Sequence, residues 1–273
     1  MRSRSQAAWE ELTAEATAIV DDAGRHGVTL RVMGSAGIRL HCRPPGRLMD
    51  ALGRPAKDID LVVRDKDRKQ MRRFLEERGY VTDRDVLIAM EGTRYSFTHS
   101  RRGTQIDVFA QRLDFCHTID VRDRLRRHPV TLPVEELMLG KLQIVEMTMT
   151  DVIDVGVILG THRVRRVNAQ LLASDTGPFD PEAIDGMHIA GLLARDWGFH
   201  HTVTMNLRRV GDLVGSGGCV DLGPEPNVRV ADGVARLLRF IDDVPKSLAW
   251  RMRDKIGERK QWWQDVDEKE ATY

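Results

Sequence analysis

Two aspartates in the apolar segment DIDLVV, Asp58 and Asp60, constrain the fold of this chain more than any other feature. The segment otherwise resembles the start of a buried strand. A buried carboxylate is unfavourable unless a cation or hydrogen-bond donors compensate it. The two side chains must therefore lie in a turn at the end of a strand, or beside a positively charged group.

The composition is that of a globular chain with a sizeable core. Of 273 residues, 41% are hydrophobic and 30% are charged, which suits one large domain or two ordinary ones. Aromatic residues make up only 5%, too few for a surface of aromatic side chains that stack on the bases of single-stranded nucleic acid. A formal net charge of +1 argues against a dedicated polyelectrolyte binder. Neither a signal peptide nor an apolar run of membrane-spanning length is found. We therefore expect a cytoplasmic protein with no membrane partner.

Hydrophobic spacing and turn residues predict the elements of a first domain over residues 1–130. The expected elements are a helix over 6–25, a strand over 28–34, a short helix from 36 that ends at paired prolines, a loop over 43–56, a strand over 58–63, a charged helix over 64–80, and a hairpin of RYSFTHS and TQIDVFAQ. Strands interleaved with helices and followed by a hairpin predict a mixed sheet.

From residue 131 to the end the pattern becomes helical. We expect helices within 132–162, 184–197 and 234–270, a break at 174–185 and a turn-rich connection over 215–233. The expected fold class is α+β, with a small mixed-sheet domain followed by a mainly helical domain over residues 131–273.

A third carboxylate, Asp107, lies in the second strand of the hairpin. It alternates with Ile106 and Val108 and so points to the opposite face from them, just as Asp58 and Asp60 share one face. If this strand lies beside DIDLVV, the three carboxylates converge and repel one another. A divalent cation removes that repulsion, and oxygen ligands suit Mg²⁺. Since Mg²⁺ completes its octahedron with water or phosphate oxygens, the pattern indicates a nucleoside triphosphate.

Gly34 and Ser35 stand where a strand gives way to a helix. Glycine lets the backbone approach a phosphate closely, and the serine hydroxyl and the first free N–H groups of the helix can bind phosphate oxygens. A phosphate-binding turn, a pair of aspartates and a third aspartate thus follow one another along the chain.

The segments MGS, DIDL and QIDVF resemble the signature of the nucleotidyltransferase superfamily with the polymerase-beta-like fold. That signature is hG[G/S], then [D/E]h[D/E]h, then an acidic residue on a following strand, and here it covers about residues 30–160. The resemblance implies that Asp58, Asp60 and Asp107 are catalytic and bind two Mg²⁺ ions, for which Mn²⁺ can substitute. It also implies in-line attack of an acceptor hydroxyl on the α-phosphorus of an NTP such as ATP or CTP.

A further segment, KLQIVEMTMTDVIDVGVIL, resembles the K…RDxxD motif of the AbiEii/MenT-type toxin nucleotidyltransferases, with Thr150 in place of the arginine. This resemblance implies that Lys141 neutralises the triphosphate, that the acceptor is a tRNA or a protein, with the 3′ end of tRNA preferred, and that a cognate antitoxin counters the enzyme. The candidate nucleotide-binding residues are Gly34, Ser35, Arg39, Lys141 and Asp151.

Each of these interpretations has an alternative. Lys141 could extend along an apolar helix with its amine in solvent, Arg39 could be an ordinary surface arginine, and Asp151 could be a solvent-facing helical residue. The acceptor could be a protein or a small molecule of the antibiotic type, or the chain could be a non-catalytic nucleotide- or RNA-binding module. The basic residues Arg163, Arg165, Arg166, Arg208 and Arg209 could form an acceptor groove only if the fold gathers them.

Overall fold

The computed structural model describes residues 4–42, 49–50, 52–90, 92–166, 183–215 and 217–265. They form an α+β fold with a mixed sheet, divided into two compact units. The sheet unit comprises Met1–Leu113 and Ile119–Leu137, and the helical unit comprises Asp114–Thr118 and Met138–Tyr273. This division lies a few residues beyond the predicted boundary at residue 130.

The first part of the chain supplies one five-stranded sheet and the helices around it. In chain order its elements are α1 (Arg4–Arg25), β1 (Leu30–Val32), α2 (Gly34–His41), β2 (Ile59–Val63), the 3₁₀ turn η1 (Asp65–Asp67), α4 (Arg68–Glu77), β3 (Tyr80–Thr82), α5 (Arg84–Ala89), β4 (Arg94–His99), β5 (Gln105–Ala110), β6 (Arg112–Asp114), β7 (Thr118–Asp120) and the 3₁₀ turn η2 (Arg122–Arg124).

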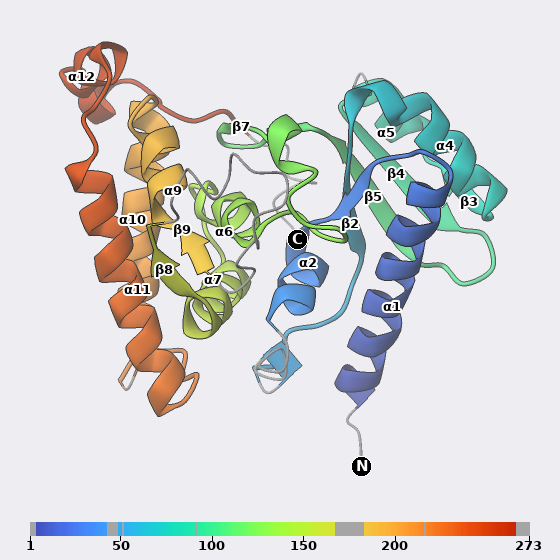
Figure 1. Cartoon of the computed structure of the whole chain (residues 1–273), viewed down its shortest axis with the longest axis horizontal. Coiled ribbons are helices and arrows are strands. Elements are labelled where there is room, and N and C mark those ends of the chain that lie inside the picture. The colour runs from blue at the N-terminus through green and yellow to red at the C-terminus, as the bar shows by residue number, and fades with distance from the viewer. Residues whose placement is uncertain are drawn as a thin grey trace. The chain divides into compact units, whose positions relative to one another are not determined.

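The strand order of the main sheet is β1-β2-β5-β4-β3, of which Figure 1 labels β2, β5, β4 and β3. Strands β2 and β5 run parallel at its centre, and the pairs β1–β2, β5–β4 and β4–β3 are antiparallel. Both central strands are apolar and largely buried, as expected for a pair covered on both faces. The predicted neighbourhood of DIDLVV and the second hairpin strand is confirmed.

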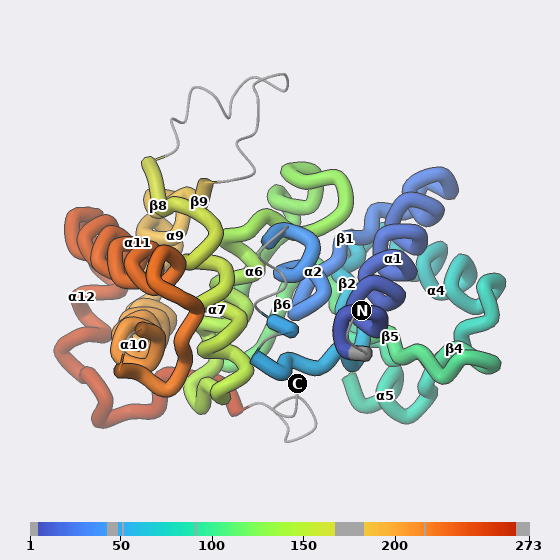
Figure 2. The backbone as a smooth tube through the Cα atoms, turned by 90° about the horizontal axis from the view of Figure 1, so that it is seen from below, coloured from blue at the N-terminus to red at the C-terminus, as the bar shows by residue number. Residues whose placement is uncertain are grey.

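Helix α1 packs against β1 and α2 through one apolar stripe (Figure 2). Trp9, Leu12, Ala16 and Ile19 follow one another at helical spacing and are all buried. The indole Nε1 of Trp9 donates a hydrogen bond to the carbonyl oxygen of Arg54 at 2.9 Å, which satisfies its one polar atom inside the core. The predicted helix over residues 6–25 is confirmed.

Two elements between the charged helix and the hairpin carry no periodic signal. Strand β3 has three residues and α5 has six, so neither is long enough to show a pattern. Helix α5 depends on its cap, because the Asp83 carboxylate accepts hydrogen bonds from the backbone N–H groups of Asp85 and Val86.

The second part of the chain is mainly helical. Its elements are α6 (Val134–Leu142), α7 (Met149–Thr161), β8 (Arg163–Arg165), β9 (Ala183–Asp185), α9 (Gly186–Leu193), α10 (Trp197–Leu213), α11 (Pro224–Asp243), α12 (Leu248–Asp254) and the 3₁₀ turn η3 (Gly257–Arg259). Helix α11 packs against α7, α9 and α10, and β8 pairs with β9 in a short parallel ribbon.

The expected turn-rich connection over residues 215–233 is wrong in its second half, because α11 already begins at Pro224. Gly223 precedes the helix with a positive φ of 94°, and Pro224 occupies the first helical turn. Proline is favourable there, since the first N–H groups of a helix have no partner within the helix and the ring fixes φ near its helical value. Gly223 and Pro224 are thus signals of a helix start.

The helix expected over residues 184–197 is also different in the structure. Residues Ala183–Asp185 form β9, α9 ends at Leu193, and Trp197 opens the next helix. Asp196 separates the two helices, because its carboxylate accepts a hydrogen bond from the Phe199 N–H and caps α10.

The expected helix over residues 234–270 is interrupted after Asp243, and α12 begins at Leu248. Residues 266–270 of this prediction, residues 43–48 and 51 of the expected loop and residues 174–182 of the expected break lie outside the described residues.

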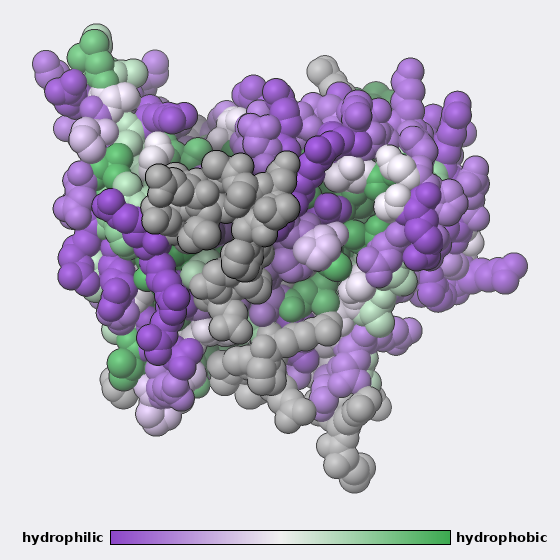
Figure 3. Space-filling model, in the orientation of Figure 1, coloured by the Kyte–Doolittle hydropathy of each residue, from purple (hydrophilic) through white to green (hydrophobic). Residues whose placement is uncertain are grey.

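Apolar side chains reach the surface on α12 and directly after it (Figure 3, upper left). Leu248, Met252 and Ile256 are 67%, 62% and 43% exposed. No helix in the described ranges is both long and apolar enough to cross a membrane.

Candidate functional site

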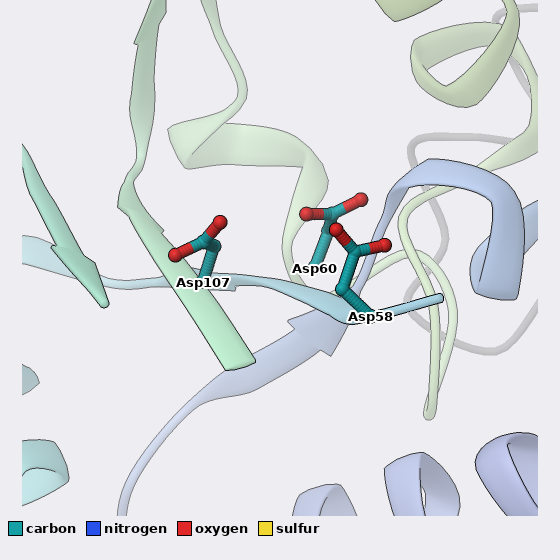
Figure 4. A group of neighbouring side chains, drawn as sticks. All are labelled: Asp58, Asp60 and Asp107. Carbon is teal, nitrogen blue, oxygen red and sulfur yellow. The ribbon is translucent and has the colours of Figure 1, made fainter. Parts of the chain in front are cut away.

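Three carboxylates meet on one side of the central strands. Asp60 of β2 lies opposite Asp107 of β5 in the parallel register, and Asp58 precedes Asp60 by two residues and so shares its face. Figure 4 shows all three side chains pointing to the same side of the sheet. One oxygen from each of the three lies within 4.8 Å of the others. Asp58 and Asp107 are only 9% and 5% exposed, while Asp60 is partly exposed.

Gly34 lies directly against this cluster. The Met33 N–H donates to the Asp60 carbonyl oxygen at 2.8 Å, which holds the end of β1 beside β2. A β-carbon at position 34 would lie 2.0 Å from Asp60 Oδ2, and Gly34 has a φ of +60°. Position 34 therefore requires glycine for two reasons: the backbone has a positive φ, and a β-carbon would overlap the Asp60 carboxylate.

Arg94, at the start of β4, binds the third carboxylate. Its Nη2 donates to Asp107 Oδ2 at 2.9 Å, and the two side chains are 8% and 7% exposed. The guanidinium also lies 5.2 Å from the ring centroid of Phe109, within cation–π range. Sequence reasoning missed Arg94. The available signal was an arginine in a strand of mainly apolar and small residues. Arg94 shares a face of β4 with Ser96, which lies opposite Asp107.

The second oxygen of Asp107 is an atom that a cation could bind. Asp107 Oδ1 is buried and has no hydrogen-bond partner within the described residues. Native proteins rarely leave such an atom without an ion or water. With Oδ2 held by Arg94, Oδ1 is the atom of Asp107 that is available as a ligand.

The three carboxylates fit a magnesium ion in chemistry and in spacing. All donors are hard oxygens, and two oxygens that share one Mg²⁺ at about 2.1 Å lie at most about 4.2 Å apart. Oxygens already within 4.8 Å of one another reach that arrangement by small side-chain rotations. Together with Arg94, the three carboxylates leave two negative charges among these four side chains, which one divalent cation balances.

Ser35 and Arg39 follow Gly34 on α2 and are both buried, at 7% and 9% exposure. Arg39 Nη2 donates to Asp50 Oδ2 at 2.8 Å, and the guanidinium lies 5.3 Å from the Trp9 ring. Arg39 is therefore not an ordinary surface arginine. Its charge is already paired with Asp50 inside the sheet unit. The predicted phosphate-binding roles of Ser35 and Arg39 stay predictions.

Lys141 belongs to the helical unit, where two carboxylates surround it. Its Nζ lies 2.9 Å from Asp151 Oδ1 and 3.2 Å from Asp154 Oδ2, and Asp154 is fully buried. This excludes the alternative of an amine extended into solvent, and it also shows that the charge of Lys141 is already balanced. The roles of Lys141 and Asp151 in nucleotide binding stay predictions.

Asp151 has a structural task at the start of α7. It forms a capping box with Thr148, in which the Thr148 hydroxyl accepts from the Asp151 N–H and the Asp151 carboxylate accepts from the Thr148 N–H. Burial acts to raise the pKa of Asp151, but the Lys141 ammonium and the Thr148 hydrogen bonds outweigh it, so that the pKa is lowered. The alternative that Asp151 is a solvent-facing helical residue is wrong, since it is 4% exposed.

Comparisons of this chain with protein-family models, with curated proteins and with solved structures found no match.

Replacing Gly34 by alanine will destabilise the sheet unit more than the same change at Gly27. Both glycines have positive φ, but a β-carbon at Gly27 would meet nothing within 4 Å, whereas at Gly34 it would overlap Asp60. We expect Gly27→Ala to lower the free energy of unfolding by about 1–2 kcal/mol. Gly34→Ala will lower it by at least about 1 kcal/mol more, because the overlap forces the carboxylate or the backbone to move.

Urea unfolding of the two variants measures this difference. Equal losses of stability would show that Asp60 does not lie against the backbone of Gly34.

The stability contributed by Asp151 will depend on pH. Because its pKa is lower in the folded chain than in the unfolded chain, the contribution is present above the unfolded pKa and is lost as the pH falls through the folded pKa. Unfolding of wild type and Asp151→Asn in urea between pH 7 and pH 3 tests this. We expect the advantage of the wild type to shrink below about pH 4.

Asp243→Asn is the control for this series, because Asp243 is exposed at the end of α11. An advantage of wild type over Asp151→Asn that stays constant down to pH 3 would contradict the role given to Lys141 and Thr148.

Proposed function

We propose that this chain is a Mg²⁺-dependent nucleotidyltransferase that moves a nucleoside monophosphate from an NTP to an acceptor hydroxyl and releases pyrophosphate. The observation that carries the proposal is the gathering of three carboxylate oxygens within 4.8 Å of one another beside the glycine that begins α2. The motif order MGS, DIDL and QIDVF supports it through the resemblance to the nucleotidyltransferase superfamily.

Asp58, Asp60 and Asp107 would hold the metal ions. When bound, Mg²⁺ neutralises the triphosphate and lowers the pKa of the attacking hydroxyl. Gly34 leaves room for the Asp60 carboxylate, and Arg94 binds Asp107 Oδ2, which leaves Oδ1 to bind an ion. The Ser35 hydroxyl and the N–H groups at the start of α2 would bind phosphate oxygens.

The reaction forms a bond between the acceptor oxygen and the α-phosphorus, and it breaks the bond from that phosphorus to pyrophosphate. The hydroxyl proton passes to solvent. The chain contributes positioning and electrostatic stabilisation, as in other phosphoryl transfers.

We propose an RNA 3′ end, of tRNA in particular, as the acceptor. This rests on the resemblance of the Lys141 segment to the toxin branch, which also implies an antitoxin partner. One alternative is transfer to a protein or to a small molecule. A second alternative is non-catalytic nucleotide or RNA binding.

The test is incubation with each α-labelled NTP, Mg²⁺ and a cell lysate, followed by separation into RNA, protein and small-molecule fractions. We expect label in the RNA fraction with wild type and none with Asp60→Asn. Label in another fraction identifies a different acceptor. Label transferred equally by both proteins, or by neither, contradicts the proposed enzyme.

A further inference from the structure

The helical unit contains an open hollow of about 620 Å³ whose walls combine apolar and cationic side chains. It is lined by Met149, His201, Met205, Arg208, Arg209, Asp212, Leu213 and Glu258. Six of these lie on α10 at spacings of three, four or one residue, so that one exposed face of this helix forms most of the wall. The size is within the range of small-molecule sites in proteins.

The apolar part of the wall is partly exposed. Met149 is 42% exposed and Met205 is 37% exposed, and Leu213 lies beside them in the same hollow. Methionine thioethers make favourable contacts with flat aromatic rings and adapt to their outline. This part of the wall suits an aromatic ligand.

His201 is held rigidly at the edge of the same hollow. Its ring stacks on Trp197 at 4.9 Å with an interplanar angle of 10°, and it meets Trp262 edge-on at 4.8 Å. Its Nε2 lies 3.1 Å from Glu258 Oε1, while 28% of the side chain remains exposed. A fixed and partly exposed aromatic ring adds to the surface on which a base can pack.

Arg208 and Arg209 supply the charge. Both are exposed, and in the described part of the chain neither side chain forms a hydrogen bond or an ion pair. This distinguishes them from Arg229 and Arg236 of α11, which pair with carboxylates one turn away. The planar guanidinium group matches phosphate oxygens in a bidentate geometry.

We propose that this hollow binds a nucleoside phosphate, either as a free nucleotide or as an unpaired residue of an RNA strand. The base packs on Met149, Met205 and His201, and the phosphate binds Arg208 and Arg209. Asp212 offers carboxylate oxygens to the amino groups of a base. The site is separate from the carboxylate cluster in the residues that form it, and it does not depend on the proposed transferase activity.

Of the basic residues expected to form an acceptor groove, the structure brings only Arg208 and Arg209 to this hollow. Arg163 and Arg165 do not line it. They lie on β8, which follows the end of α7, whereas Met149 begins that helix. Arg163 and Arg165 therefore do not contribute to the proposed site.

The test measures binding in EDTA, so that metal-dependent binding of nucleotides at the carboxylate cluster does not contribute. The ligands are the four nucleoside monophosphates, by calorimetry, and a fluorescein-labelled single-stranded RNA decamer, by anisotropy. Arg208→Ala/Arg209→Ala removes the phosphate contacts and should raise Kd at least about tenfold. Met205→Ser should raise Kd about fivefold, because it removes part of the apolar surface without changing the charge.

The matched control is Arg236→Ala/Arg239→Ala, which removes the same charge from exposed positions on α11. We expect it to leave Kd within about twofold of wild type. Binding of the decamer alone identifies an RNA strand as the ligand, and binding of monophosphates identifies free nucleotides. Absence of binding by wild type up to about 1 mM, or an equal loss in the control, overturns the proposal.

Discussion

Asp60→Asn will lose both nucleotide transfer and the stabilisation that Mg²⁺ gives to the wild type. The oxygens of Asp58, Asp60 and Asp107 lie within 4.8 Å of one another, so that one missing carboxylate removes a ligand from any ion they share. At a Mg²⁺ concentration of 100 times Kd, a single site stabilises the folded chain by about 2.7 kcal/mol. We expect this gain to disappear in Asp60→Asn, and the rate of transfer to fall by about 10³-fold or more.

Thermal unfolding with Mg²⁺ and with EDTA measures the first effect, and transfer of labelled NTP measures the second. Asp21→Asn is the control, because Asp21 is exposed on α1, in the same unit and away from the central strands. It should behave as wild type in both experiments. A variant Asp60→Asn that still responds to Mg²⁺ as wild type does would show that the cluster is not the metal site.

Arg94→Met will strongly lower the free energy of unfolding of the sheet unit. It removes the guanidinium that holds Asp107 Oδ2 and leaves a buried carboxylate next to two others. Breaking a buried ion pair from one side costs about 3–5 kcal/mol. Mg²⁺ should restore part of this loss, because the ion supplies another positive charge to the same carboxylates.

Urea unfolding in EDTA measures the stability lost with the ion pair, and urea unfolding in Mg²⁺ measures how much of it the ion restores. Arg72→Met is the matched control, since Arg72 pairs with Glu76 at 3.7 Å on the exposed face of α4, with both side chains nearly half exposed. Exposed pairs contribute about 0–1 kcal/mol, and Mg²⁺ should not affect this variant. If Arg94→Met does not fold, Arg94→Lys keeps the charge and should still lose stability relative to wild type. An Arg94→Met variant as stable as wild type in EDTA contradicts the pairing.

The carboxylate cluster could be predicted in part, because strand geometry determines which face of its strand each side chain occupies. Side chains alternate along a strand, so Asp58 and Asp60 had to share a face, and Asp107 had to oppose its apolar neighbours. The parallel pairing of β2 with β5 then brings the faces together. Arg94 could not be predicted in the same way. Its contact with Asp107 depends on the cross-strand register of β4, which no pattern within either strand contains.

The helical unit could be predicted only in outline. Its helical character is visible in the spacing of apolar residues, but the boundaries depend on single capping residues such as Asp196 and on Pro224 at a helix start. The hollow on α10 was not predicted at all. Met149 and Glu258 reach it from segments far apart in the sequence, and only the packing of the unit brings them together.

The central claim is that the three acids of the sheet unit bind a divalent metal ion. Crystals grown with Mn²⁺ and measured at its absorption edge test this most directly, because anomalous scattering locates the ion independently of any model of the solvent. The proposed site predicts a peak within about 2.3 Å of oxygens of Asp58, Asp60 and Asp107, and its loss in crystals of Asp60→Asn. Fully occupied manganese bound elsewhere, with these carboxylates making only protein and water contacts, would contradict it.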